Sequence, residues 1–410
     1  MRRLAIIFAV VFAIAARNVL RHRRRSILTL LAIALSVIMM LFAHGLVNGL
    51  EKLLIDEAVF GNMGAVQVHK QGFTANVSKD PLSFRFAADA ALLAKIAAVK
   101  DVTAVSARIP FAAMLSAGDK SLATPILAFD PVGEYAVCPL RLENLTRGAR
   151  LHAGEAILSP ALADRLHLTP GATAVLLGSD SEGVLNAAEA KVAGVMKDVA
   201  LLTMQPKMMH VALDVAQGLL RMDGQALELA ISLKDYRDPD AAKRAIAEVL
   251  GAGFEVHTWR ERSKAQSDFI EQRKRIFGLI TRTFLLLALI GVANTMLMSV
   301  LSRTREIGTM LAVGVRRAMI RRLFVAEALV IAVAGTGLGA GIALSLIAWL
   351  GRAGLTMPMP GKAPMILHPY ASPAFVTETL LFVLVGALLA AALPAHRAAK
   401  LKPVEALASL

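Results

Sequence analysis

Residues 27–50 read ILTLLAIALSVIMMLFAHGLVNGL and decide the fold class, because this run of 24 residues contains no Asp, Glu, Lys or Arg. An α-helix of about 20 apolar residues crosses the roughly 30 Å hydrocarbon core of a bilayer. Three later segments, 276–302, 323–350 and 374–395, have the same apolar character. The sequence therefore predicts a membrane α-helical protein with four transmembrane helices, one before and three after the long segment 51–275.

The composition supports a membrane protein with a sizeable water-facing part. Hydrophobic residues make up 56% of the 410 residues and charged residues only 19%, which excludes a disordered chain and disfavours a soluble enzyme. The formal net charge of +14 first suggests a nucleic-acid partner, but residues 51–275 hold 26 Lys or Arg against 27 Asp or Glu. The positive excess therefore lies in the apolar ends of the chain, which fits membrane topology, and we expect no nucleic-acid partner.

The basic residues also predict an orientation. The segment 303–322 holds six arginines against one acid, Glu306, whereas 351–373 holds only Arg352 and Lys362. Cytoplasmic loops carry the excess of Lys and Arg. This rule places 303–322 and both ends of the chain in the cytoplasm, with the loop 351–373 outside. The segment 51–275 then forms a large extracytoplasmic domain, and the tail 396–410 lies inside.

The first 26 residues leave two alternatives. Met1–Arg3 followed by LAIIFAVVFAIA resembles a signal peptide, but cleavage near Ala16 would place the cluster Arg21–Arg25 on a translocated chain, against the positive-inside rule. We favour an interfacial helix along the cytoplasmic leaflet whose basic ends contact anionic lipid headgroups.

The large domain predicts mixed α/β structure and no catalytic centre. Strands and helices alternate over 51–117 and 226–275, and a β-rich insertion covers 118–225. Within the large domain 51–275 we expect a strand break at Pro110 and a helix over Glu155–Leu166. No Gly-x-Ser-x-Gly or His-Glu-x-x-His occurs, the histidines lack ligand spacing, and the chain has one cysteine. We therefore predict no metal site and no enzyme activity in this domain.

Four glycines in the third span predict close helix packing. They form the pairs Gly335/Gly339 and Gly337/Gly341, each four residues apart. The run is superficially similar to a nucleotide-binding glycine loop, but no strand precedes it and it lies inside an apolar helix. Both pairs are therefore predicted to lie at helix–helix contacts.

The segment 302–317, SRTREIGTMLAVGVRR, is the most informative motif. Ile307, Met310, Leu311 and Gly314 recur at helical spacing and predict a short amphipathic helix. Such a helix in a short loop is suited to docking into a groove on a partner. The alternative is a solvated turn that lies on lipid headgroups.

This segment resembles the cytoplasmic loop of ABC-transporter permeases of the MacB/FtsX/LolC–LolE superfamily. Residues 16–25 resemble the basic segment before the family's first helix, and Pro394–Leu407 resembles its C-terminal signature. The resemblance implies an extracytoplasmic domain with an α/β Porter part and a β-rich Sabre part, and a coupling helix seated on an ATPase. The implied coupling residues are Arg305, Glu306, Gly308, Leu311, Gly314, Arg316 and Arg317.

The resemblance also implies a division of labour. No Gly-x-x-x-x-Gly-Lys-[Ser/Thr] occurs in the sequence, so we expect ATP and Mg²⁺ on a separate ATPase dimer and no cofactor on this chain. Segments 64–69 and 258–261 look like the LolC/LolE branch, which implies lipoprotein release from the bacterial inner membrane. The implied partners are a second permease chain, identical or different, a lipoprotein cargo and a periplasmic chaperone or adaptor. Two alternatives stay open: a stand-alone MacB-like efflux permease and an FtsX-like regulator of a cell-wall hydrolase.

In LolC/LolE relatives, lipoprotein acyl chains sit between the first and second spans of the two permease subunits. The corresponding apolar residues here are Met39, Met40, Phe42, Phe284 and Leu287. Flexible Met and Leu side chains can repack around varied ligands, so these residues are a candidate substrate route. The alternative is that they face bulk lipid.

Overall fold

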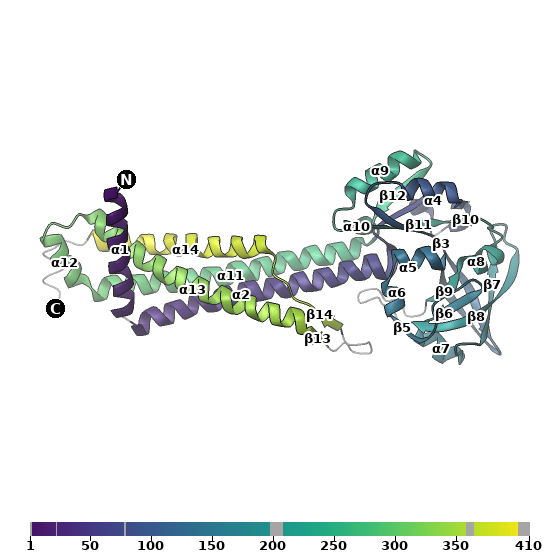
Figure 1. Cartoon of the computed structure of the whole chain (residues 1–410). Coiled ribbons are helices and arrows are strands. Elements are labelled where there is room, and N and C mark those ends of the chain that lie inside the picture. The colour runs from purple at the N-terminus through teal and green to yellow at the C-terminus, as the bar shows by residue number, and fades with distance from the viewer. Residues whose placement is uncertain (1, 22, 78, 197–207, 358–364, 401–410) are drawn as a thin grey trace. The chain divides into compact units, whose positions relative to one another are not determined.

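The computed structural model describes residues 2–21, 23–77, 79–196, 208–357 and 365–400. The chain divides into two compact units, whose elements are shown in Figure 1. A helical bundle is built from Met1–Lys52 and Ile270–Leu410, and an α/β domain is built from Leu53–Phe269.

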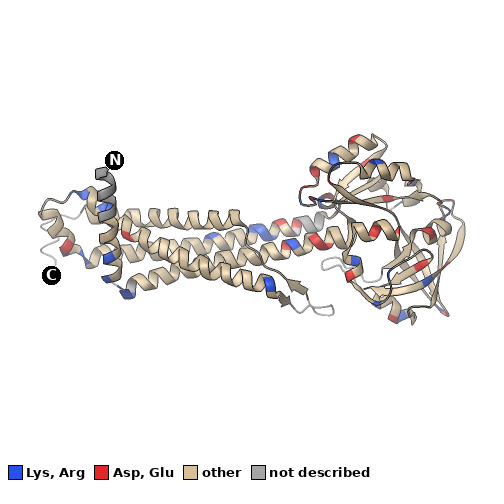
Figure 2. Ribbon diagram, viewed as in Figure 1, with Lys and Arg blue, Asp and Glu red and all other residues tan. Residues whose placement is uncertain are grey.

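Four long helices form the bundle: α2 (Arg23–Asp56), α11 (Lys264–Ser302), α13 (Arg317–Ala353) and α14 (Pro373–Ala399). Each contains a stretch long and apolar enough to cross a membrane. In Figure 2 their ribbons run over long distances without a charged residue. The predicted fold class, one apolar helix before and three after a large α/β domain, is confirmed.

The core of the bundle is made of aliphatic side chains and alanine from all four long helices. It includes Leu41 of α2, Met296 of α11, Ala332 of α13 and Val383 of α14, all less than 5% exposed. Residues on the opposite helix faces are exposed and apolar, as expected of surfaces that contact lipid.

Only one of the two predicted glycine pairs packs against a neighbouring helix. A Cβ on Gly335 would lie 2.9 Å from the Leu30 carbonyl oxygen, and one on Gly339 would lie 2.6 Å from that of Ala34, so these glycines allow α13 to approach α2 closely. The prediction was wrong for Gly337 and Gly341, where a Cβ would meet no described atom within 4 Å. A residue two positions further along a helix points to nearly the opposite side.

Two shorter helices and a hairpin complete the bundle. Helix α1 (Arg2–Arg21) crosses its end (Figure 1) and packs Val11 and Ala15 against Leu323 and Ala326 of α13. The remaining elements are α12 (Thr304–Ala312), β13 (Leu355–Met357) and β14 (Met365–Leu367).

A ten-stranded sheet organises the α/β domain in the order β12-β1-β11-β3-β4-β9-β6-β8-β5, with β7 paired to β3 and β8. Its strands are β1 (Val66–Lys70), β3 (Val102–Ala117), β4 (Lys120–Phe129), β5 (Leu145–Gly148), β6 (Glu155–Leu158), β7 (Thr173–Ser179), β8 (Leu185–Met196), β9 (Met209–Ala212), β11 (Glu228–Leu233) and β12 (Phe254–Thr258). The short strands β2 (Phe86–Ala87) and β10 (Gln225–Ala226) form a separate pair.

The helices of this domain are short. They are η1 (Glu57–Met63), α3 (Phe73–Asn76), η2 (Pro81–Phe84), α4 (Ala90–Ala97), α5 (Pro131–Val137), α6 (Leu140–Glu143), α7 (Pro160–Leu166), α8 (Leu213–Leu220), α9 (Asp240–Leu250) and α10 (Trp259–Arg262). Strands β12, β1, β11 and β3, from the two outer sequence segments, are neighbours at one end of the sheet, and strands of the middle segment continue it.

Two local expectations were wrong. Pro110 does not break a strand, because β3 pairs with β11 up to Arg108 and with β7 only from Met114, so at Pro110 β3 pairs with β4 on one side and with no described strand on the other. A proline without an N–H is tolerated at such an edge-like position. The expected helix over Glu155–Leu166 is strand β6 followed by α7, which begins at Pro160.

A buried polar cluster lies beside the sheet and links residues far apart in the sequence. Arg108 is 1% exposed and donates to Glu134 at 2.7 and 2.8 Å and to Glu228 at 3.0 Å. Arg141 donates to Glu134 at 2.8 Å and to Nε2 of His210 at 2.8 Å. The two arginines and two glutamates balance in charge, which offsets much of the cost of burying them.

Burial and neighbouring charges shift the pKa values in this cluster. Burial raises the pKa of Glu228, but the hydrogen bond from His69 and the charge of Arg108 outweigh it and bring the pKa to about 2. For His210, burial lowers the pKa well below its usual value, and Arg141 and Arg108 lower it further. Because Arg141 donates to Nε2, the His210 ring is neutral with its proton on Nδ1.

We predict that the α/β domain loses stability as the pH falls below about 6.5, the pKa of an exposed histidine. The unfolded chain then protonates His210 while the folded domain does not, so the free energy of unfolding falls by up to about 1.4 kcal/mol per pH unit. His210→Gln should flatten this loss. Unfolding is followed by the fluorescence of buried Trp259 in a Trp349→Phe background.

The matched control is His152→Gln, because the His152 side chain is 59% exposed. An equal pH dependence in wild type and His210→Gln would contradict the prediction.

Candidate functional site

The candidate site is the end of the bundle where α12 joins α11 to α13. The expectation that the apolar face of this helix is available to a partner is contradicted by the structure. Ile307 is fully buried, and Met310 and Leu311 pack on a cluster formed by Val300, Ile320, Phe324, Ala395 and Ala398. Gly308 is buried as well. Leu311 and Gly308 therefore lie on the side of α12 that covers the ends of the membrane helices.

The opposite side of α12 and the following turn are exposed. Val313 is 81% exposed, which is unusual for a large apolar residue. The other exposed residues of this surface are Arg305, Glu306, Thr309, Ala312, Gly314, Arg316 and Arg317. We call these residues, with Val313, the elbow surface. Five of the seven expected coupling residues lie on it.

Gly314 is needed by the backbone of the elbow. Its φ is +95°, a conformation that L-residues with a Cβ rarely adopt. Val315 N–H donates to Met310 O at 3.0 Å and Gly314 N–H donates to Leu311 O at 3.1 Å, the hydrogen bonds of a Schellman C-cap. A Cβ here would meet no described atom within 4 Å, so the positive φ, and not crowding within the described chain, favours glycine at this position.

A charged network ties the elbow to the bundle. Arg303, 8% exposed, donates to Glu306 of α12 at 2.9 Å and to Glu327 of α13 at 2.7 Å. Its guanidinium also lies over the Phe324 ring at 5.7 Å. Since Glu327 is only 3% exposed and sits in an apolar helix, its charge requires such a partner.

Helix α1 joins the same network. Asn18 donates to Glu327 at 2.6 Å, and an Nη1 atom of Arg21 lies 3.7 Å from Glu306. The α1 helix therefore contacts both α12 and α13 through polar side chains one turn apart.

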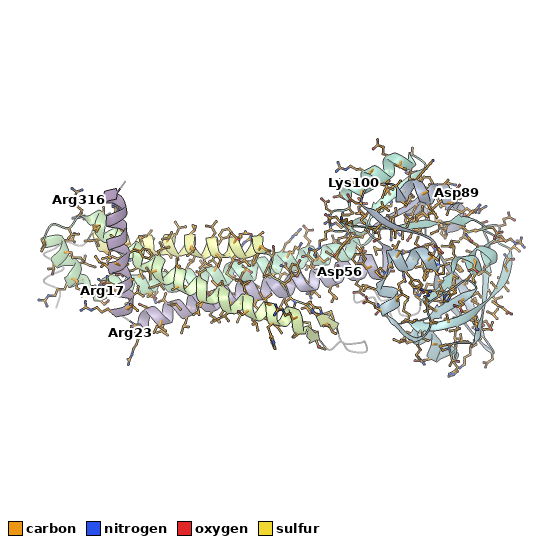
Figure 3. The ribbon with its side chains drawn as sticks, viewed as in Figure 1. Arg17, Arg23, Asp56, Asp89, Lys100 and Arg316 are labelled. Carbon is orange, nitrogen blue, oxygen red and sulfur yellow. The ribbon has the colours of Figure 1, made fainter. Side chains whose placement is uncertain are left out.

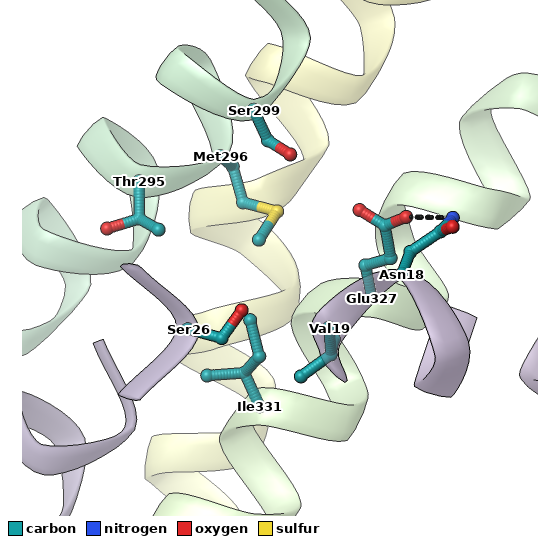
Figure 4. Close-up of a pocket in the computed structure, with 8 residues that line it drawn as sticks. All are labelled: Asn18, Val19, Ser26, Thr295, Met296, Ser299, Glu327 and Ile331. Carbon is teal, nitrogen blue, oxygen red and sulfur yellow. Dashed lines mark hydrogen bonds between the residues drawn. The ribbon is translucent and has the colours of Figure 1, made fainter. Parts of the chain in front are cut away.

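A small polar cavity adjoins this network (Figure 4). Its lining residues are Asn18, Val19, Ser26, Thr295, Met296, Ser299, Glu327 and Ile331. About 20 Å³ is accessible to the centre of a water molecule, room for about one water. A cavity of this size has room for one water molecule beside Glu327 and is too small for a cargo molecule.

The candidate substrate-route residues are split between the surface and the core. Met39, Phe284 and Leu287 are 41%, 36% and 58% exposed. Met40 is 4% exposed and Phe42 packs on the bundle core, so these two do not line an outer wall. Met39 and Met40 are 100° apart on the helix, which separates their environments.

Arg303, Glu327 and Asn18 were not expected to form a linked group. No spacing rule connects positions 18, 303 and 327, so no local pattern indicates that these residues meet. Among the described residues, no group of three or more His, Cys, Asp or Glu side chains is placed to hold a metal ion.

Comparisons with known proteins identify the family to which the chain belongs. The family described as MacB-like periplasmic core domain matches residues 26–249, more than half of the chain, and the family described as FtsX-like permease C-terminal matches residues 278–403. The chain therefore belongs to the MacB/FtsX superfamily of ABC-type permeases.

Individual relatives agree with this class. The macrolide export ATP-binding/permease protein MacB of Bordetella avium is 30% identical over 282 residues, which cover 64% of this chain and 41% of that protein. MacB of Shewanella oneidensis is 42% identical over 119 residues, 29% of this chain and 17% of that protein. The chain spans less than half the length of these relatives.

Two extracytoplasmic domains are among the solved structures to which part of the chain is similar. The periplasmic region of MacB from Actinobacillus actinomycetemcomitans has a TM-score of 0.37 and 11% identity, covering 51% of this chain and 94% of that one. The extracellular domain of the ABC-type transporter YknZ from Gram-positive bacteria has a TM-score of 0.35 and 12% identity, covering 47% and 99%.

We predict that Gly314→Ala weakens the end of α12 by about 1 kcal/mol, because alanine is strained at positive φ. The amide of Val315 should exchange its hydrogen roughly fivefold faster in the full-length protein. Gly278→Ala is the matched control, since its Cβ also meets no described atom and its φ is not positive. Equal exchange in both variants would show that the conformation of Gly314 is not what holds the turn.

Proposed function

We propose that this chain is the permease subunit of an ATP-driven ABC complex in the bacterial inner membrane. Two permease chains and a separate ATPase dimer, which binds ATP and Mg²⁺, would complete it. The observation that carries the proposal is the elbow surface, an exposed turn joined by a buried charged network to the membrane-spanning helix α13 and to α1. No Walker A motif occurs in these 410 residues.

The proposed contact uses the exposed side of α12. Val313 is an apolar anchor, and Arg305, Arg316 and Arg317 surround it with positive charge. Interfaces are commonly built this way, with apolar residues at the centre and polar residues at the rim. A push on the elbow acts on Arg303 and Glu306 and through Arg303 on Glu327, so α11, α12 and α13 move together.

Mechanical transmission fits the spans better than ion relay does. The apolar stretches of the long helices hold few charged residues, and Glu327, buried in α13, is engaged by Arg303 and Asn18. Ion pathways use ionisable residues along the span. We therefore favour a stroke transmitted by whole helices over an alternating-access pore.

The first test is Val313→Glu in the full-length protein. A carboxylate in place of the apolar anchor must lose its water when the contact forms, which should weaken ATPase association at least about tenfold, measured by co-purification of the ATPase from native membranes and by its stimulated ATP hydrolysis. Val132→Glu is the matched control, because Val132 is 85% exposed and lies in the α/β domain. Wild-type association by Val313→Glu would refute the elbow as the docking site.

We propose an exported cargo taken from the outer leaflet or periplasm, with a lipoprotein as the first candidate. Its support is the exposed apolar surface at Met39, Phe284 and Leu287. The two segments that look like the LolC/LolE branch have structural roles here. Gly64 has φ +77° beside β1, and Thr258 and Glu261 form the capping box of α10. The segments 64–69 and 258–261 therefore carry little information about the cargo.

Efflux of small molecules is the second candidate, favoured by relatives named macrolide export proteins. An FtsX-like hydrolase regulator is a further alternative that needs no cargo at all.

Photo-crosslinkers at Met39 and Phe284 distinguish these functions. A lipoprotein exporter should give lipoprotein adducts that disappear when ATP is supplied, because extraction removes the acyl chains from the helix surface. Leu389, 69% exposed on α14, is the matched control position. Capture of phospholipid alone at all three positions would reject the lipoprotein and leave efflux or regulation.

A further inference from the structure

Exposed arginines gather at the end of the bundle formed by α1, α12 and the starts of α2 and α13, as Figure 2 shows. They are Arg17, Arg21, Arg23, Arg24, Arg305, Arg316, Arg317, Arg321 and Arg322. Residues 1–26 contain no Asp or Glu, and 303–322 contain only Glu306. This end therefore presents a strongly positive surface.

On α1 the cations alternate with exposed apolar side chains. Phe12, Ile14 and Leu20 are 38%, 43% and 64% exposed, while Val11 and Ala15 face α13. Long apolar and arginine side chains on the exposed part of one helix are typical of helices that lie among lipid headgroups. A purely protein-binding cationic surface would not need the exposed Leu20.

The arginines also lie at the depth of the headgroups. The apolar span of α2 begins at Ser26, only three residues after Arg23. Figure 3 places Arg17 and Arg23 at the same end of the bundle, with the Arg23 side chain extending away from it. Guanidinium groups at this level meet lipid phosphates, to which they can donate two parallel hydrogen bonds.

Helix α1 is connected to the elbow. Arg21 lies 3.7 Å from Glu306 of α12 and its side chain is 72% exposed, so a phosphate can reach it. Asn18 is bonded to Glu327 and keeps α1 on α13. A phosphate on Arg21 therefore competes with Glu306 for the same guanidinium.

We propose that the end of α1 and the start of α2 bind anionic phospholipid headgroups through Arg17, Arg21 and Arg23, and that this binding draws Arg21 away from Glu306 on α12. Membrane composition would then set how firmly the elbow is held. The effect on coupling rests on the proposed function, whereas the lipid binding does not.

The test uses the full-length protein in nanodiscs, with bimane attached at Leu20→Cys. Cys138, the one natural cysteine, is fully buried, so labelling is confined to position 20. Bromine-labelled phosphatidylglycerol and phosphatidylcholine at equal mole fraction are compared as quenchers. Each cation near an anionic surface strengthens binding about fivefold, so we expect a preference of at least about fivefold for phosphatidylglycerol that declines with added salt.

Variants identify the binding residues. Arg17→Gln/Arg21→Gln/Arg23→Gln should abolish the preference, and the corresponding triple Lys variant should retain it, which separates loss of charge from loss of structure. Lys95→Gln/Lys100→Gln/Lys120→Gln, exposed in the α/β domain, is the matched control and should behave as wild type. No preference in wild type, or an unchanged one in the triple Gln variant, would overturn the proposal.

Two further outcomes are decisive. Glu306→Gln should raise the phosphatidylglycerol preference at least about twofold by removing the competitor, and an unchanged preference would overturn the competition with Glu306. If the triple Gln variant no longer binds the ATPase but keeps its preference for phosphatidylglycerol, the cations serve a protein partner and the lipid site is rejected. Quenching requires no ATPase, so failure of the proposed function is distinguishable from failure of this proposal.

Discussion

Arg303 and Glu327 form a buried ion pair at one end of the helical bundle, and the surrounding elements depend on it. A carboxylate inside an apolar helix is costly unless it is paired, and removal of one partner from a buried pair costs about 3–5 kcal/mol. Arg303 also bonds Glu306, and Asn18 of α1 bonds Glu327. One constraint thus holds α12 and α13 against the end of α11, because separating Arg303 from Glu327 would leave an unpaired charge in a poorly solvated site, and the hydrogen bond from Asn18 adds α1 to the group.

In the proposed complex, this constraint would allow a short helix to transmit force. The apolar side of α12 covers Val300, Phe324 and Ala395 on three membrane helices, so its apolar residues are used for attachment. Its charged and small residues are left for a partner. The Schellman turn at Gly314 returns the chain directly into α13. The elbow is therefore short and held on two sides, and displacement of α12 is passed to the bundle with little loss in a flexible loop.

The α/β domain also buries charged side chains, but it pairs them within one cluster. Arg108, Arg141, Glu134 and Glu228 lie away from water and satisfy one another, so their charges cancel within the cluster. His210 accepts from Arg141 and stays neutral, which makes this domain sensitive to acid while the bundle relies on apolar packing. The two units are thus predicted to respond to different variables: pH for the domain, and lipid and contact with a partner for the bundle.

The amino-acid sequence determined the four apolar helices, the large domain between them and the amphipathic character of α12, because each follows from composition or periodicity within one segment. It also predicted α1 as a helix and the packing of Gly335 and Gly339. Only the tertiary structure decided which face of α12 is covered, that Gly337 and Gly341 point away, and that Met40 is buried beside exposed Met39. It alone brought Asn18, Arg303 and Glu327 together, and made a strand of Glu155–Leu158 by pairing it with β8 and β9. Burial and pairing depend on neighbours distant in the chain, and a local pattern carries no record of which neighbours those are.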